Sequence, residues 1–175
     1  MTTKITRIKK IIIFLMGIAL LGFLFLIILN EIIYFILGGD QGKFKKYDKG
    51  VTIEVKNSSE ENITNLTFSF GYLENIHFQE LGEIKQIKPG QTLKLTSKSI
   101  QRTNADLSMY LQYQLADSKT IIKDSLVYLD IKSPRKVVVL VDITKVDDEG
   151  NLFYTYDGYN GFTQYTGETD PYGDN

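Results

Sequence analysis

The pattern of apolar and polar positions divides the chain into an N-terminal apolar segment and a C-terminal segment with a period of two. Residues 11–29 read IIIFLMGIALLGFLFLIIL, without one charged or polar side chain. As a helix with a rise of about 1.5 Å per residue, this run spans about 28 Å, close to the thickness of bilayer hydrocarbon. A cleaved signal peptide has a shorter apolar region, of about 7–15 residues. The pattern predicts one N-terminal transmembrane helix that acts as an uncleaved signal-anchor, with a cleaved signal sequence as the alternative.

A second apolar run, residues 32–37, follows Asn30 and Glu31, so we place the membrane segment at residues 11–37. In one interpretation Asn30 and Glu31 lie at the headgroup level and the helix continues along the surface. In the other, the span is residues 13–37 and buries Glu31 in the outer leaflet, where an ionisable side chain needs a protein partner. Glu31 is therefore a candidate partner-binding residue.

Positive charge on the two sides of the apolar run predicts its orientation. Residues 1–10 form a basic stub directly before the run, with no acid and four cationic side chains: Lys4, Arg7, Lys9 and Lys10. The first lysine after the run, Lys43, stands fourteen residues beyond Leu29. Basic residues close to a span favour the cytoplasmic side. We therefore predict a single-pass protein of the cell membrane with a cytoplasmic N-terminus and an extracytoplasmic C-terminal domain.

After a short polar stalk, residues 38–50, apolar side chains alternate with polar ones as they do in half-buried strands. The clearest alternations cover residues 51–55, 66–70, 93–95 and 107–115. A continuous β-branched run, residues 137–141, is typical of a strand covered on both faces. About eight short strands over residues 51–156 predict an all-β ectodomain, an antiparallel β-sandwich that is immunoglobulin-like in size. Because Trp and Cys are absent, this architectural prediction transfers no functional residue.

Residues 157–175 show neither period and contain four acids but no Lys or Arg. We predict that they form a disordered acidic tail. Tyr159, Phe162 and Tyr165 recur along it and are candidate partner-binding residues. The tail is either an exposed, solubilising end or a segment whose aromatic side chains dock on a partner or on the edge strand of the domain itself.

Charge and cysteine content narrow the classes of function. Residues 39–175 hold 16 basic and 20 acidic groups, so the ectodomain repels phosphate and no nucleic-acid partner is expected. The chain has no Cys, which excludes disulfides and favours a bacterial envelope over an animal cell surface.

Few residues offer reactive chemistry. The single histidine, His77, could act as a catalytic base only with a nucleophile and an orienting acid, and the sequence gives no such constellation. Residues 147–149 are acidic but match no calcium-loop spacing, so we interpret them as a hairpin turn. Asn57, Asn62 and Asn65 begin N-x-S/T sequons, a pattern that a polar turn produces equally well. We predict no catalytic residue, no metal site and no cofactor.

Together these features favour a non-enzymatic protein. We expect a single-pass β-sandwich protein that contacts the lipid bilayer through its helix and binds a protein partner at the cell envelope. An immunity factor and an accessory subunit of a secretion or envelope machine are specific versions. The alternatives are an envelope hydrolase, which needs two carboxylates about 5–10 Å apart in a cleft, and a ligand-binding sensor subunit.

Overall fold

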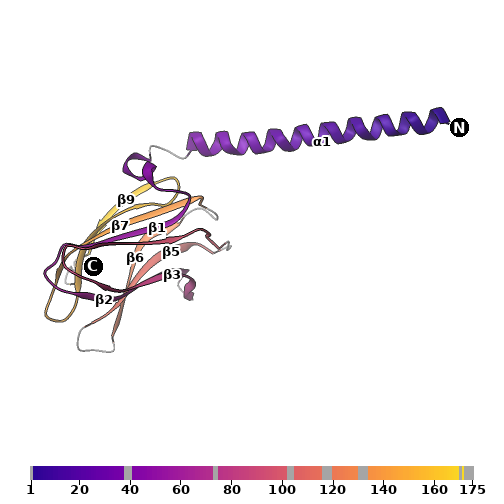
Figure 1. Cartoon of the computed structure of the whole chain (residues 1–175). Helices are drawn as coiled ribbons and strands as arrows, with labels where there is room; N and C mark the ends of the chain where they lie inside the picture. Colours follow the sequence, from indigo (N-terminus) through magenta and orange to yellow (C-terminus); the bar gives the residue numbers. More distant parts are fainter. Residues whose placement is uncertain are drawn as a thin grey trace. The chain divides into compact units, whose positions relative to one another are not determined.

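Two compact units make up the chain in the computed structural model (Figure 1). They are residues 1–39 and residues 40–175, and each is described by itself. The described residues are 2–37, 41–72, 75–101, 105–115, 120–129, 134–169 and 171.

Helix α1, Thr2–Leu37, forms the first unit. It contains the expected apolar segment and begins earlier, because the basic stub has no Pro or Gly to interrupt a helix. Ile12–Ile33 is a candidate membrane span of 22 residues with a mean hydropathy of 3.1 and no part buried within the chain. Large apolar side chains are exposed along the whole span, which suits lipid better than water. The helix thus has the length and composition of a membrane anchor or of a signal sequence.

Among the described residues of the second unit, nine strands form two sheets. The strands are β1 Gly50–Asn57, β2 Ile63–Tyr72, β3 Asn75–Ile87, β4 Thr92–Ser97, β5 Leu107–Gln114, β6 Ile121–Leu129, β7 Lys136–Val146, β8 Leu152–Tyr159 and β9 Gln164–Glu168. The five-stranded sheet has the order β4-β1-β7-β8-β9, and the four-stranded sheet has the order β3-β2-β5-β6.

One strand pair differs from the antiparallel prediction. β1 and β7 run parallel, with Ile53 opposite Val139. Hydrophobic alternation defines which face of a strand is buried and carries no information on strand direction, which is why the sequence pattern missed this pair. β7 contains the β-branched run, and its Val137, Val138 and Val139 are fully buried. Val137 and Val139 belong to the main core and Val138 to a second buried cluster with Phe44, which agrees with the prediction of a strand covered on both faces.

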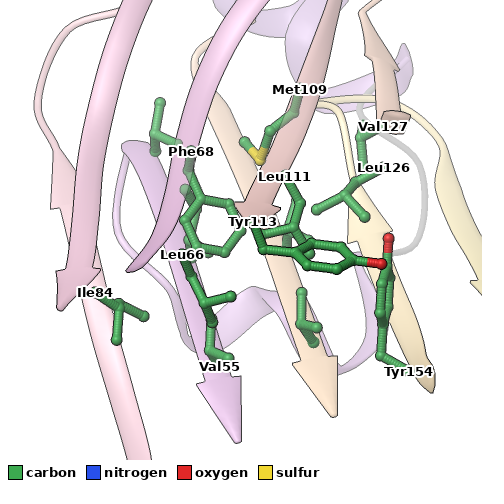
Figure 2. Packing of buried hydrophobic residues seen from close by; sticks show 14 of the residues in the cluster. Val55, Leu66, Phe68, Ile84, Met109, Leu111, Tyr113, Leu126, Val127 and Tyr154 are labelled. Atoms are coloured by element: carbon green, nitrogen blue, oxygen red, sulfur yellow. The ribbon is translucent and has the colours of Figure 1, made fainter. Parts of the chain in front are cut away.

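The two sheets enclose the main apolar core, which confirms the β-sandwich (Figure 2). Phe68 and Leu111 come from the four-stranded sheet, and Val55 and Tyr154 come from the five-stranded sheet. All four are at most 1% exposed. The immunoglobulin-like arrangement is not confirmed, because β1 and β2 lie in different sheets, whereas the first two strands of an immunoglobulin domain pair within one sheet.

The expected polar stalk is wrong over its second half. A 3₁₀ helix, η1, covers Gly42–Lys46, and it packs on the five-stranded sheet. Phe44 and Tyr47 are buried in a second cluster with Val138 and Tyr159. Positions three apart eclipse one another on a 3₁₀ turn, so both aromatic side chains reach the same surface. Two aromatic residues among lysines thus turn this segment into part of the domain.

The expected disordered tail is wrong at least over residues 157–168. Residues 157–159 complete β8, and β9 pairs with β8 in antiparallel register as a new edge strand. Two cross-strand pairs combine a tyrosine with a glycine, Tyr156 with Gly167 and Tyr165 with Gly158. A large side chain opposite a glycine covers the exposed backbone there. Residues 170 and 172–175 lie outside the described residues.

Candidate partner-binding surface

The described residues contain no group of three or more His, Cys, Asp or Glu side chains that could hold a metal ion. His77 is exposed on β3, and its backbone N–H donates to the Oδ1 atom of Asn75. The acidic segment forms the predicted hairpin turn between β7 and β8, in which Gly150 N–H donates to the carbonyl of Asp147. The carboxylate of Asp147 accepts the backbone N–H groups of Glu149 and Asn151, at 3.0 and 2.8 Å. This carboxylate therefore organises the turn.

One end of the sandwich carries a small pocket of about 120 Å³. It is lined by Asn62, Ile63, Thr64, Tyr113, Gln114, Val146, Gly150 and Leu152. This lining contains no Asp or Glu, so the pocket does not provide the carboxylate pair that a glycoside hydrolase uses.

Two tyrosines and an aspartate link the two sheets, and one of the tyrosines, Tyr113, also lines this pocket. Tyr154 of β8 donates its hydroxyl to Oδ2 of Asp124 on β6, at 2.9 Å. The hydroxyl of Tyr113 accepts the backbone N–H of Leu152 at 3.3 Å. Figure 2 shows the Tyr113 and Tyr154 rings directed toward one another inside the core.

Burial dominates the ionisation of this Tyr–Asp group. It raises the pKa of Tyr113 to about 12, and the negative charge of Asp124 adds to the effect. Burial likewise raises the pKa of Tyr154, and it raises the pKa of Asp124 although the Tyr154 hydrogen bond opposes that shift. The tyrosines are thus neutral hydrogen-bonding groups at neutral pH, which suits a structural link between the sheets.

The three aromatic candidates of the C-terminal segment dock on the domain itself. Tyr159 is 1% exposed, and its ring stacks on Phe44 with the centroids 5.8 Å apart. Phe162 and Tyr165 are half-buried around the turn between β8 and β9. The side chain of Asn160 accepts the Phe162 N–H at 3.1 Å and donates to the Tyr165 hydroxyl at 2.8 Å. Of the alternatives for this segment, docking of its aromatic side chains on the domain itself describes the structure best. A role of these three residues in partner binding stays a prediction.

Glu31 lies on α1, inside the candidate span Ile12–Ile33. Its side chain is exposed on the helix, as are those of its apolar neighbours. A carboxylate at this position is compatible with both sequence interpretations, the headgroup level and the outer leaflet. Its role as a partner-binding residue therefore also stays a prediction.

A different surface, on the outer face of β5 and β6, has the features of an interface. Beyond α1, the exposed large hydrophobic side chains among the described residues are Ile121, at 55%, and Tyr128, at 45%. Both belong to β6, the edge strand of the four-stranded sheet. An edge strand with exposed apolar side chains is a ready contact for another chain.

The neighbouring positions extend this surface. Ser108 of β5 lies opposite Tyr128, and Tyr110 lies opposite Ser125. We call these four residues, together with Ile121, the Tyr–Ser face. Side chains of β5 point alternately inward and outward, so Leu107, Met109 and Leu111 enter the core while Ser108 and Tyr110 face outward.

Charge distinguishes the Tyr–Ser face from the rest of the sandwich domain. The outward positions of β5 and β6 include Lys123 and no acid, since Asp124 turns toward Tyr154. Residues 39–175 as a whole carry four more acids than bases. The sequence offered one signal for this face, because Tyr110 occupies a polar phase of the alternation in residues 107–115.

Comparison of the chain with protein-family models, with curated proteins and with solved structures finds no match.

Proposed function

We propose that this protein is a single-pass, membrane-anchored β-sandwich that binds a protein partner at the extracytoplasmic side of the cell envelope through its Tyr–Ser face. The observation that carries the proposal is that the two large hydrophobic side chains exposed outside α1 among the described residues, Ile121 and Tyr128, both belong to the edge strand β6 and lie near its two ends. The apolar helix α1 supports the anchoring, and the basic stub before it supports the orientation.

The composition of the face favours a protein over a small molecule. Tyrosine offers a large, rigid contact area with a polar tip, and serine adapts its hydrogen bonds to a partner. The backbone of β6 adds a second mode of contact, since an extended segment of a partner can pair with an edge strand. By contrast, the pocket of about 120 Å³ is below the roughly 300 Å³ at which small-ligand sites begin.

An immunity factor and an accessory subunit differ in the partner that they bind, an exported toxin in the first case and a fixed component of an envelope machine in the second. Both require the same exposed, rigid surface on an anchored domain. The hydrolase alternative gains no support from the pocket lining, which lacks carboxylates.

Site-specific photocrosslinking in intact cells tests the proposal. A photoreactive phenylalanine analogue replaces Tyr110 or Tyr128 on the face, and Thr155, which is exposed on β8 of the other sheet, carries it in the control. We expect position 110 and position 128 to yield one shared protein adduct that the Thr155 variant does not give. Adducts that are equally abundant at all three positions, or none at any of them, would contradict the proposal.

A further inference from the structure

A group of exposed lysines lies on η1 and on β4 of the sandwich domain. Lys45 and Lys46 belong to η1, Lys49 follows it, and Lys94 and Lys98 lie on and just after β4. The backbones of these segments are close, since a Cβ atom placed on Gly50 would come within 3.3 Å of the Cα atom of Lys98. We call these five lysines the basic patch.

Aromatic packing holds η1, and with it the lysines, in a fixed place on the sandwich. Phe44 is 1% exposed and stacks on Tyr159. Lys136 of β7 donates to Oε1 of Gln41 at 2.9 Å and to the carbonyl of Phe44 at 3.3 Å. Lys43 forms an ion pair with Asp157 of β8. The segment is therefore a docked, rigid element of the domain.

Tyr47 draws two of the lysines together. The ammonium groups of Lys46 and Lys94 lie 5.0 and 5.4 Å from the centroid of its ring. Cation–π contact offsets part of the repulsion between two like charges. Two acids lie in the same region, Asp48 and Glu54, and Glu54 accepts the Tyr47 hydroxyl at 3.3 Å. Five lysines against two acids leave the patch cationic on a domain that is acidic overall.

Covalent length limits the distance between the end of α1 and η1. Four residues separate Leu37 from Gly42, so an extended chain keeps these two residues within about 18 Å of each other. The headgroup layer adds about 5–8 Å outside the hydrocarbon on each side of a bilayer. With α1 inserted, η1 is thus within reach of the headgroups, where cationic side chains meet the surface charge of anionic lipids.

We infer that the basic patch binds the phosphate groups of anionic phospholipids in the leaflet from which the domain emerges, and so holds the sandwich against the membrane. This inference rests on the membrane anchoring in the proposed function. Docking uses the edge strand β4 and η1, which packs on β7 and β8 of the same five-stranded sheet, and the Tyr–Ser face belongs to the other sheet. The domain then meets lipid and a partner with different surfaces.

Lysine acetylation of the full chain in liposomes tests the inference. The chain is reconstituted in phosphatidylcholine alone or with about one third phosphatidylglycerol, acetylated briefly, and the rate at each lysine is measured by mass spectrometry. One lysine at an anionic surface gains about 1 kcal/mol, a factor of about five in occupancy. We expect the rates at Lys45, Lys46 and Lys94 to fall several-fold with phosphatidylglycerol. The exposed Lys85, Lys88 and Lys123, which belong to neither η1 nor β4, serve as internal controls whose rates stay unchanged.

Three further arms separate the ways in which the inference can fail. Equal rates at the patch in both liposomes would overturn it. Equal protection by inorganic phosphate in phosphatidylcholine liposomes would overturn the assignment to lipid and indicate a free-anion site. Carbonate extraction is run on the same samples: loss of the chain from the membrane would contradict the anchoring, whereas a retained chain with an unchanged footprint would contradict only the patch. The triple variant K45Q/K46Q/K49Q is expected to lose the protection at Lys94, and the matched variant K85Q/K88Q/K123Q is expected to keep it.

Discussion

At the scale of single residues, two buried asparagines organise the loops of the sandwich. Asn57 and Asn160 are both fully buried. Asn57 accepts the Ser59 N–H at 3.0 Å and donates to the carbonyl of Ile87 at 3.1 Å. A side-chain amide that is buried and engaged on both sides is not open to glycosylation, so the turn interpretation of this sequon holds. The sequence pattern is the same for exposed Asn62, and burial alone distinguishes the two.

Asn160 has the larger predicted effect, because its side chain fixes the turn that precedes β9. Its Oδ1 atom accepts the N–H groups of Phe162 and Thr163, and its Nδ2 atom donates to Tyr165. Asn160→Ala removes these three hydrogen bonds, and we expect the free energy of unfolding to fall by about 2–3 kcal/mol. Urea unfolding of the full chain in detergent measures the change. The exposed Asn62→Ala is the control, and equal effects of the two substitutions would contradict this role.

Tyr113 makes the free energy of unfolding of the domain depend on pH in the alkaline range. Burial raises its pKa from an ordinary value of about 10 to about 12. The unfolded chain ionises first, so the stabilisation is complete below about pH 10 and is lost as the pH rises to about 12. The slope is about 1.4 kcal/mol per pH unit for one such group. Tyr113→Phe is expected to reduce the slope between pH 10 and 12 in urea titrations. Exposed Tyr128→Phe is the control, and an unchanged slope in Tyr113→Phe would exclude the effect.

At the scale of elements, the alternating strands were predictable and the segments that cover them were not. Alternation in residues 51–55 and 107–115 reports on burial directly, and these segments became β1 and β5. In η1 and β9, glycines, lysines and acids surround the aromatic side chains, so composition indicates loops. Their structure depends on tertiary contacts, Phe44 on Tyr159 and Tyr156 over Gly167, which no local window contains. The Tyr–Ser face was missed because an outward tyrosine satisfies the same alternation as any polar residue.

Close approach of the two sheets at Gly158 gives a prediction at this scale. A Cβ atom on Gly158 of β8 would lie 2.4 Å from Cγ2 of Val127 on β6. Valine has a stiff χ1 and is 1% exposed here, so it cannot move aside at low cost. We expect Gly158→Ala to lower the free energy of unfolding by about 1–3 kcal/mol through overpacking.

A double-mutant cycle with Val127→Ala identifies the cause of this loss. Removing Cγ2 of Val127 makes room for the new methyl group, so the double variant should be more stable than the sum of the single effects by about 1 kcal/mol or more. Unfolding by urea, followed by tyrosine fluorescence, supplies all four stabilities. Strict additivity of the two substitutions would show that the contact between β8 and β6 is not the source of the loss.

At the scale of the whole molecule, the sequence separates the apolar helix from the sandwich as clearly as the structure does. The boundary lies after residue 39, between a helix with exposed apolar side chains and a domain with a closed core. The coarse fold class, an apolar helix and a β domain, followed from the sequence because the uninterrupted apolar run and the alternation with a period of two are both strong patterns. The candidate partner-binding surface could not be predicted from the sequence, because an interface is defined by which side chains a fold leaves exposed. The membrane orientation is predicted from the charge of the basic stub and not from the fold, so it is measured directly.

The absence of native cysteine makes that measurement clean, because every thiol in a variant is an introduced one. Two single-cysteine variants report the two ends: Thr2→Cys before the apolar run and Thr155→Cys, which is exposed on β8. With the basic stub in the cytoplasm, a membrane-impermeant maleimide should label position 155 in intact cells and position 2 only after permeabilisation. The wild-type chain, which has no thiol, sets the background. Labelling of position 2 in intact cells, or protection of position 155, would reverse the topology and would place the Tyr–Ser face and the basic patch on the cytoplasmic side.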